Sequence, residues 1–205
     1  MCRLIFETVK WENGAPCLLP WHQRRVESSM KRCGMKGAPV PELAAVLESW
    51  PGPEGVGLYK CHITYDTRGR VRKPVFEPYR PRMVRVLVGV EVPSSFDYSC
   101  KWEDRAALMA AGAGLGDGEE ALILRDGFVT DTRYSSVVFG DGCSWITPDT
   151  YLLPGTKRAF LLEQGMIEAR PLRGWEVKEF RFCSLINAML DLGDVVVRTE
   201  DIVLP

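Results

Sequence analysis

A glycine, a hydroxyl and two basic side chains stand together just before a predicted helix. The segment 152–158 reads Leu-Leu-Pro-Gly-Thr-Lys-Arg, and a helical pattern follows up to residue 164. Helix N-termini normally favour acidic side chains, because their free N–H groups carry partial positive charge. Gly155, Thr156 and Lys157 instead suit an anion such as phosphate, held by N–H groups and a hydroxyl. The alternative is a solvated loop whose basic residues face water.

Arg25 is a second candidate for anion binding. It falls on or beside the apolar stripe of a predicted helix that ends near residue 33, a stripe that includes Val26 and Met30. A guanidinium on an inward stripe is costly unless it is paired or bound to an anion. The alternatives are an ion pair with a carboxylate, or a side chain whose charged end reaches water.

Lys101 could act as a nucleophile that forms a Schiff base. It lies between Cys100 and Trp102, several residues beyond a strand that reads as buried. Apolar and aromatic neighbours can lower the pKa of a lysine by desolvation, and a lysine that forms a Schiff base needs such a shift. The alternative is an ordinary solvated lysine near a strand end.

Asp131 lies in a segment that is rich in hydroxyl groups. Residues 126–136 contain an Asp-Gly turn, followed by Thr-Asp-Thr and two serines. These side chains could form hydrogen bonds with a polar ligand. The alternative is a β-hairpin turn in which Asp131 acts as a local cap.

The composition is that of an ordinary globular protein. The 205 residues are 46% hydrophobic and 26% charged, and 26 basic against 27 acidic residues give a net charge of −1. That balance argues against nucleic acid and anionic membranes as partners. Apolar runs stay well short of the roughly 18 residues of a membrane span. An acidic residue comes as early as Glu7, which argues against a signal peptide, so we expect a cytoplasmic protein.

The cysteines and histidines argue against a disulfide scaffold and against a metal site. Seven cysteines are scattered without a C-x-x-C pair, and the only histidines are His22 and His62. Disulfide frameworks and zinc sites need tighter spacing than this. We expect most of the cysteines to be small buried hydrophobes.

The elements that must position these residues mix strands with few helices. Helices are predicted at 20–33, 43–50, 102–113 and 156–164, and strands at 4–10, 18–19, 56–65, 70–76, 83–92, 120–125, 135–140, 166–171, 180–189 and 194–198. This mixture predicts an α+β or α/β fold. The proline-rich stretch 77–81 is the best linker candidate. We therefore predict a small N-terminal α/β lobe, 1–78, and a larger C-terminal lobe, 79–205, which carries Lys101.

In order and spacing, these pieces resemble the class IV aminotransferases, the pyridoxal-phosphate enzymes of fold type IV. The family includes branched-chain and D-amino acid aminotransferases and aminodeoxychorismate lyase. The resemblance covers residues 4–189 and implies a two-lobed fold, a homodimer and pyridoxal 5'-phosphate as the cofactor. The matching segments are Phe-Glu-Thr-Val-Lys at 6–10, His-Gln-Arg-Arg at 22–25, Lys101, Thr-Asp at 130–131, Trp-Ile-Thr-Pro at 145–148 and the segment 152–158.

The resemblance implies a role for each matching residue. Lys101 matches the lysine that holds the cofactor covalently and moves the substrate α-proton. Asp131 takes the place of a glutamate that pairs with the protonated pyridine nitrogen. Asn187 resembles an asparagine beside the cofactor in the lyase branch. The residues that match phosphate contacts are Arg25 of the H-x-x-R motif, Ser135, Gly155, Thr156 and Lys157.

Several positions depart from the family pattern. Asp131 is one methylene shorter than glutamate, and Lys157 replaces a threonine. Arg133 and Tyr134 stand where the family usually has serines, which leaves Ser135 as the phosphate contact of that segment.

Thr8 favours lyase chemistry, because it aligns with a threonine that the lyase branch uses beside the cofactor. In that reaction Lys101 would take the α-proton of aminodeoxychorismate, and pyruvate would leave 4-aminobenzoate behind. An aminotransferase acting on an amino acid is the alternative, and both imply a small amino compound as substrate. A remoter alternative is a non-catalytic cofactor-binding protein, which the altered segment at Arg133 and Tyr134 motivates.

Overall fold

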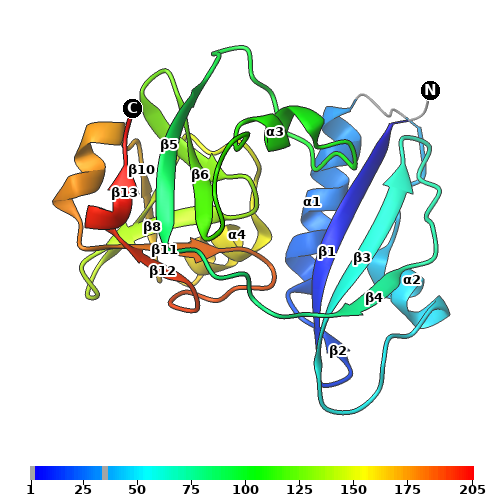
Figure 1. Ribbon diagram of the computed structural model, residues 1–205. Coiled ribbons are helices and arrows are strands. Elements are labelled where there is room, and N and C mark those ends of the chain that lie inside the picture. The colour runs from blue at the N-terminus through cyan, green and yellow to red at the C-terminus, as the bar shows by residue number, and fades with distance from the viewer. Residues whose placement is uncertain (1–2, 34–36) are drawn as a thin grey trace. The chain divides into compact units, whose positions relative to one another are not determined.

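The computed structural model describes residues 3–33 and 37–205. The chain divides into two compact units (Figure 1). The first comprises residues up to Arg80 together with Ser99–Asp104, and the second comprises Pro81–Tyr98 and Arg105–Pro205.

The first unit is built on an antiparallel sheet. In its described part the sheet has four strands in the order β2-β1-β3-β4. β1 and β3 pair along their whole length, from Leu4 opposite Asp66 to Glu12 opposite Leu58. The tight turn after β1 uses Asn13 and Gly14, both with positive φ, as two-residue hairpins require. The strands are β1 (Leu4–Glu12), β2 (Ala15–Pro16), β3 (Leu58–Asp66) and β4 (Val75–Pro78).

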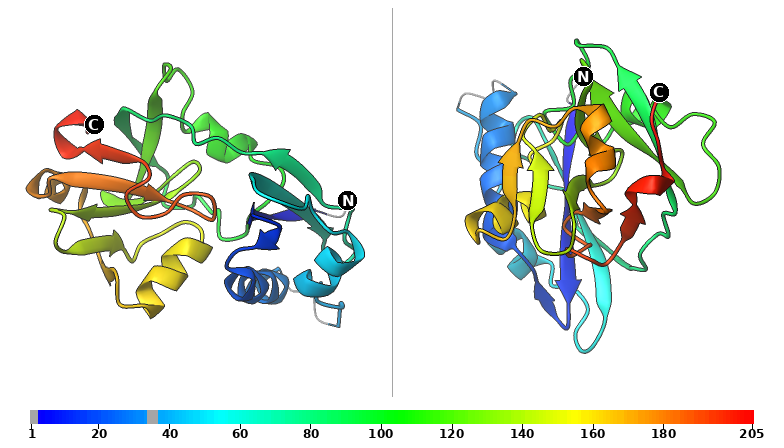
Figure 2. Two further views of the ribbon diagram at one scale, coloured as in Figure 1. Left: turned by 90° about the horizontal axis from the view of Figure 1, so that it is seen from below. Right: turned by 90° about the vertical axis from the view of Figure 1, so that its left-hand side faces the viewer.

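Two helices, α1 (Leu19–Arg32) and α2 (Leu43–Ser49), lie on the same side of this sheet (Figure 2, left). The predicted apolar stripe of α1 is buried at Val26 and Met30, which belong to one core cluster with Ile5 and Val9 of β1. Side chains two apart on a strand share a face. Glu7, between Ile5 and Val9, therefore points into the same helix-covered core.

The segment Ser99–Asp104 belongs to the first unit because it pairs with the free edge of β1. The backbone N–H of Phe6 donates to the carbonyl of Lys101 at 3.0 Å, and that of Glu103 donates to the carbonyl of Leu4 at 2.9 Å. The predicted boundary between 78 and 79 assigned Lys101 to the C-terminal lobe. The compact units differ on this point, because long-range strand pairing returns the lysine to the N-terminal sheet.

The second unit is built on a larger mixed sheet. Its described strands follow the order β10-β9-β8-β7-β6-β5-β13, with β11 paired to β8 and β12 to β11. β5 pairs in parallel with both β6 and β13. The strands are β5 (Val86–Val92), β6 (Glu119–Arg125), β7 (Phe128–Thr132), β8 (Ser136–Gly140), β9 (Trp145–Pro148), β10 (Glu168–Arg170), β11 (Phe182–Ile186), β12 (Val196–Arg198) and β13 (Ile202–Val203).

Short helices accompany this sheet. Leu161 of α4 packs in one core cluster with Val138 of β8 and Ile186 of β11, so the helix start is fixed against the strands that carry the candidate site. The predicted turn between β6 and β7 is confirmed, because Asp126 and Gly127 both have positive φ. The helices are α3 (Ala106–Ala110), α4 (Thr156–Glu163) and two 3-10 turns, η1 (Gly174–Glu179) and η2 (Thr199–Asp201).

The mixed α/β class is confirmed, but several boundaries were wrong. The predicted strand at 18–19 is the start of α1, and the predicted helix at 102–113 is helical only over Ala106–Ala110, because residues before it pair with β1. β2, β7, β9 and β13 were not predicted. No helix in the described part of the chain is long and apolar enough to cross a membrane.

Candidate functional site

In the first unit, Glu7 holds two basic side chains of α1. Arg25 donates from Nε to Glu7 Oε1 at 2.9 Å and from Nη2 to Glu7 Oε2 at 2.5 Å. His22 Nδ1 lies 2.5 Å from Glu7 Oε2. Of the alternatives for Arg25, the structure shows the ion pair, in a bidentate geometry that fixes the direction of the guanidinium.

Electrostatics keep Glu7 ionised in this buried place. Burial raises the pKa of its carboxyl, but the charge of Arg25 and the hydrogen bond from His22 outweigh burial and lower the pKa to about 2. The pKa of His22 is lowered, first by burial and also by the charges of Arg25 and Lys101, although Glu7 opposes this shift. The imidazole is therefore neutral near pH 7, with Nδ1–H donating to Glu7.

Replacing Glu7 by glutamine is expected to destabilise the protein by about 3–5 kcal/mol at pH 7, because a buried cation loses its counter-charge. The pKa of about 2 in the folded protein lies below the ordinary glutamate pKa of 4.5. The stabilisation by Glu7 is thus present above pH 4.5 and lost as pH falls towards 2. Urea unfolding at pH 7 and pH 3 should show the gap between wild type and Glu7→Gln narrowing in acid.

The matched control for this prediction is Glu77→Gln. Glu77 also pairs with a basic residue of the same unit, Lys60, but both side chains are well exposed. Exposed ion pairs contribute little, so this variant should unfold close to wild type. Equal stability of Glu7→Gln and Glu77→Gln at pH 7 would refute the buried-pair argument.

Lys101 is half-buried beside β1. Its Nζ lies 4.9 Å from the ring centroid of Phe6, and its positive charge reaches His22. Thr8 is two residues after Phe6 on β1, so the two side chains share a face. The first unit therefore places Lys101 beside Phe6, which shares its face of β1 with Thr8, whereas Glu7 pairs with His22 and Arg25 on the opposite face.

In the second unit, Asp131 on β7 has one carboxylate oxygen engaged and one without a hydrogen bond. Oδ2 accepts from the backbone N–H groups of Leu152 at 2.7 Å and Leu153 at 3.1 Å. Oδ1 is buried and has no hydrogen-bond partner among the described residues. These partners lie 21 and 22 residues away along the chain, so the local hairpin-cap interpretation of Asp131 is wrong.

Burial raises the pKa of Asp131 to about 6, against the opposing effects of the two backbone N–H groups, the nearby Ser136 hydroxyl and the charge of Arg158. A buried carboxylate oxygen without a donor is costly. The arrangement suits a ligand that brings a positively charged N–H group to Oδ1, because such a group would favour the ionised carboxylate.

The start of α4 forms a cradle next to Asp131. Its N-terminal N–H groups carry no side-chain cap, and Thr156 Oγ1 is buried without a hydrogen-bond partner among the described residues. A Cβ at Gly155 would lie 2.8 Å from Ser136 Oγ, so a larger residue would force the Ser136 side chain or the helix start to shift. Free N–H groups and hydroxyls in one place suit a phosphate.

The basic residues after Gly155 are not solvated, so that alternative is wrong. Lys157 is 6% exposed and its Nζ forms an ion pair with Asp191, while Arg158 is 8% exposed and donates to the carbonyl of Pro148 at 2.9 Å. Both side chains thus hold α4 in place. Because the Lys157 side chain is already paired, we expect Lys157 to contact an anion through its backbone N–H.

Ser135 and Asn187 meet in the second unit. Asn187 Nδ2 donates to Ser135 Oγ at 3.0 Å and to the carbonyl of Tyr134 at 3.2 Å. Its Oδ1 accepts from the backbone N–H groups of Met189 and Leu190. The structure therefore gives Asn187 the role of fixing the Tyr134–Ser135 segment, and contact with a cofactor stays a prediction.

Sequence reasoning missed three residues of these clusters. Glu7 could have been found from strand alternation, because it stands between the inward-facing Ile5 and Val9. His22 lies three residues before Arg25, on or beside the same stripe of α1, but the sequence around it names no partner. Ser136 was quoted with the hydroxyl-rich segment, but its approach to Gly155 depends on a contact across 19 residues that carries no local signal.

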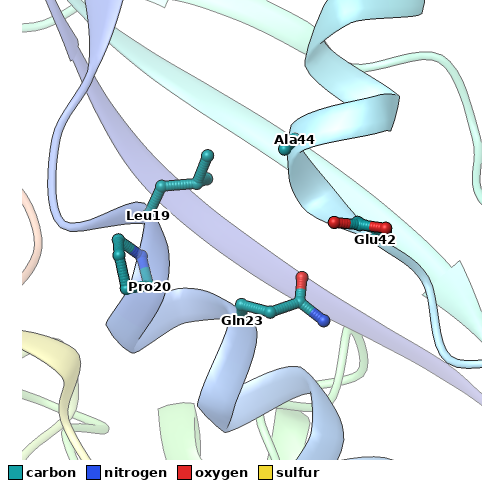
Figure 3. A pocket seen from close by; sticks show the side chains of 5 residues that line it. All are labelled: Leu19, Pro20, Gln23, Glu42 and Ala44. Atoms are coloured by element: carbon teal, nitrogen blue, oxygen red, sulfur yellow. The ribbon is translucent and has the colours of Figure 1, made fainter.

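A shallow hollow lies elsewhere in the first unit, between the starts of α1 and α2 (Figure 3). Its volume of about 170 Å³ is below the roughly 300–1,000 Å³ of typical ligand pockets. The amide of Gln23 is engaged there with the backbone of Pro41 and Leu43. None of its five lining residues is a predicted site residue. They are Leu19, Pro20, Gln23, Glu42 and Ala44.

Comparison with known proteins adds to this geometry. No family model matches the chain. It is 32% identical over 186 residues to an uncharacterized protein of Haemophilus influenzae, with 90% of this chain and 97% of that protein covered.

Solved structures are similar over nearly the whole chain. A candidate 4-amino-4-deoxychorismate lyase from Haemophilus somnus 129PT is 32% identical, with a TM-score of 0.85 and coverage of 93% of this chain and 98% of that one. A candidate amino-acid aminotransferase from Mesorhizobium loti is 20% identical, with a TM-score of 0.79 and coverage of 98% and 99%. The 4-amino-4-deoxychorismate lyase from Pseudomonas aeruginosa is 20% identical, with a TM-score of 0.67 and coverage of 95% and 83%.

Proposed function

Since the chain belongs to the class IV aminotransferase family of fold type IV, we propose that it is a pyridoxal-phosphate-dependent enzyme, foremost an aminodeoxychorismate lyase that releases 4-aminobenzoate and pyruvate. One observation carries the proposal. Asp131 Oδ1 and Thr156 Oγ1 are buried without hydrogen-bond partners in the described residues of the same unit. These atoms fit the two polar ends of pyridoxal phosphate, the ring nitrogen and the phosphate.

The residues that would hold the cofactor follow from this fit. Asp131 Oδ1 would accept the ring N–H, and the backbone N–H groups of Thr156 and Lys157, with the Thr156 hydroxyl, would hold the phosphate beside Gly155. We assign further phosphate contacts to Arg25 and Ser135 and a neighbouring position to Asn187, as the family resemblance implies.

The chemistry that pyridoxal phosphate supplies, when bound, is the withdrawal of electrons from the carbon beside the substrate's amino group. Lys101 would carry the cofactor on Nζ and then take the proton from that carbon. Thr8, on the face of β1 that carries Phe6, would orient the group that leaves. Glu7 would hold the guanidinium of Arg25 in place. With this function we propose a homodimeric, cytoplasmic enzyme that acts on a small amino compound.

The experiment that tests the proposal supplies the purified protein with pyridoxal phosphate and aminodeoxychorismate. We expect equimolar 4-aminobenzoate and pyruvate. A parallel panel of amino donors with 2-oxoglutarate measures aminotransferase activity. Amino-group transfer without 4-aminobenzoate would establish the aminotransferase instead, and neither product from a protein that binds the cofactor would establish the non-catalytic alternative.

Replacing Gly155 by alanine is expected to weaken pyridoxal phosphate binding by about tenfold or more, equal to about 1.4 kcal/mol. The added Cβ would lie 2.8 Å from Ser136 Oγ and push the helix start away from β8. The dissociation constant can be measured by equilibrium dialysis. The control is Gly116→Ala in the same unit, where a Cβ would meet only the carboxylate of Glu119, with Oε2 at 3.4 Å and Cδ at 3.7 Å. Equal affinities of the two variants would remove Gly155 from the phosphate site.

A further inference from the structure

Two cysteines of the first unit lie next to each other, although they are 67 residues apart in the chain. The sulfurs of Cys33 and Cys100 are 3.1 Å apart. A disulfide bond is 2.03–2.05 Å long, so the sulfurs need to approach by only about 1 Å. Cys33 ends α1, and Cys100 lies in the segment that pairs with β1. A bond between the two sulfurs would therefore join the end of α1 to the segment that is hydrogen-bonded to β1.

The two thiols differ in their access to solvent. Cys100 is 2% exposed, whereas Cys33 is only partly buried. An oxidant in solution would therefore reach Cys33 first, and Cys100 would be in place to react with the product. Accessible thiols beside a second, resolving thiol are typical of cysteines that are reversibly oxidised.

We propose that Cys33 and Cys100 form a redox-active pair that closes to a disulfide directly beside Lys101, with a peroxide as the oxidant. In the first step the Cys33 thiol gains an oxygen atom from hydrogen peroxide, which leaves as water, and becomes a sulfenic acid. In the second step the Cys100 sulfur displaces that oxygen as hydroxide, which takes the Cys100 proton to form a second water. Two electrons pass from the two thiols to the peroxide.

Other cysteines serve as internal comparisons. Cys61 is fully buried, and burial raises the pKa of its thiol to about 12, which keeps it protonated and unreactive. Cys143 is exposed and lies in the second unit. Its oxidation therefore measures how an exposed thiol outside the pair reacts with the oxidant. The proposal requires that Cys33 and Cys100 react together, and not merely that an exposed thiol reacts.

The test treats the reduced full-length protein with hydrogen peroxide, blocks remaining thiols with N-ethylmaleimide and maps the peptides by mass spectrometry. We expect a cross-linked peptide pair containing Cys33 and Cys100, lighter than the two reduced peptides by about 2 Da, the mass of two hydrogen atoms. Dithiothreitol should reverse the link. The control Cys143→Ser should form the same link.

Single variants show the order of the two steps. In Cys100→Ser, Cys33 should stop at a sulfenic acid that dimedone traps, and in Cys33→Ser, Cys100 should stay reduced. Both replacements conserve size, and melting curves of the reduced variants confirm folding. Oxidation of Cys33 or Cys143 in the wild type without a Cys33–Cys100 link would overturn the proposal.

The effect of the disulfide on Lys101 rests on the proposed function, but formation of the disulfide does not. Because Cys100 precedes Lys101, drawing Cys100 towards α1 should slow the attachment of pyridoxal phosphate to Nζ, measured by borohydride reduction and peptide mapping of reduced and oxidised protein. Labelling that is equal in both states would refute this effect. An absence of label in both states would refute the proposed function and leave the cross-link result standing.

Discussion

The Lys101→Ala variant is expected to remain folded, to bind no pyridoxal phosphate covalently and to lose turnover by at least about 10⁴-fold. The substitution removes the nitrogen that would carry the cofactor and the base that would take the substrate proton. Folding should survive, because the backbone carbonyl of residue 101, which accepts from the Phe6 N–H and ties the segment to β1, is unchanged in alanine.

Borohydride reduction followed by peptide mapping provides the measurement, with turnover assayed beside it. Wild type should carry the label on Lys101, and the variant should carry none. Lys60→Ala is the matched control, since Lys60 is another lysine of the first unit and pairs with Glu77 at the surface. Activity of Lys101→Ala near the wild-type level, without added amine, would remove Lys101 from the mechanism.

The chemistry of single residue types could be read from the sequence. Lysine among aromatic neighbours, arginine on an apolar stripe and glycine before a helix each have few physical explanations. Of these three residues Arg25 is buried, and Lys101 and Gly155 are partly buried. Local patterns also predicted α1, whose stripe of Val26 and Met30 repeats at helical spacing.

Contacts between residues far apart in the chain could not be predicted from local sequence patterns. Lys101 follows a predicted strand of the second unit in sequence, yet its backbone pairs with β1 of the first. Asp131 likewise finds its donors at Leu152 and Leu153, 21 and 22 residues further along the chain. A polar group is satisfied by whichever partner the completed topology brings near, so neither contact has a signal in the neighbouring residues.

Asp131→Asn is expected to make the cofactor-free protein more stable at pH 7.5 and the loaded enzyme far less active. Burial raises the pKa of Asp131 from 3.8 to about 6. Its stabilising contribution is therefore present below pH 3.8 and lost as pH rises through about 6. Asparagine keeps the shape and carries no charge at any pH. The variant should thus melt close to wild type at pH 4 and above it at pH 7.5.

Asp141→Asn is the matched control for the pH dependence. Asp141 also accepts two backbone N–H groups, from Cys143 and Ser144, but it is exposed and its pKa is lowered by those bonds. Its stabilising contribution is present at high pH and lost in acid, the opposite sign to Asp131. At pH 7.5 the two variants should therefore shift the melting temperature in opposite directions.

The turnover of Asp131→Asn tests whether Oδ1 of Asp131 takes part in the reaction. A neutral amide cannot stabilise the proton on the ring nitrogen of the cofactor, so turnover of Asp131→Asn should fall by about 10²–10³-fold, the usual loss when one preorganised electrostatic contact is removed. Covalent attachment through Lys101 should persist, which separates this variant from Lys101→Ala. A carboxylate that only ties β7 to residues 152 and 153 predicts the reverse, a less stable protein with normal turnover per folded molecule. Because a more stable protein with less activity cannot arise from lost structure, that combination would assign Asp131 to the cofactor.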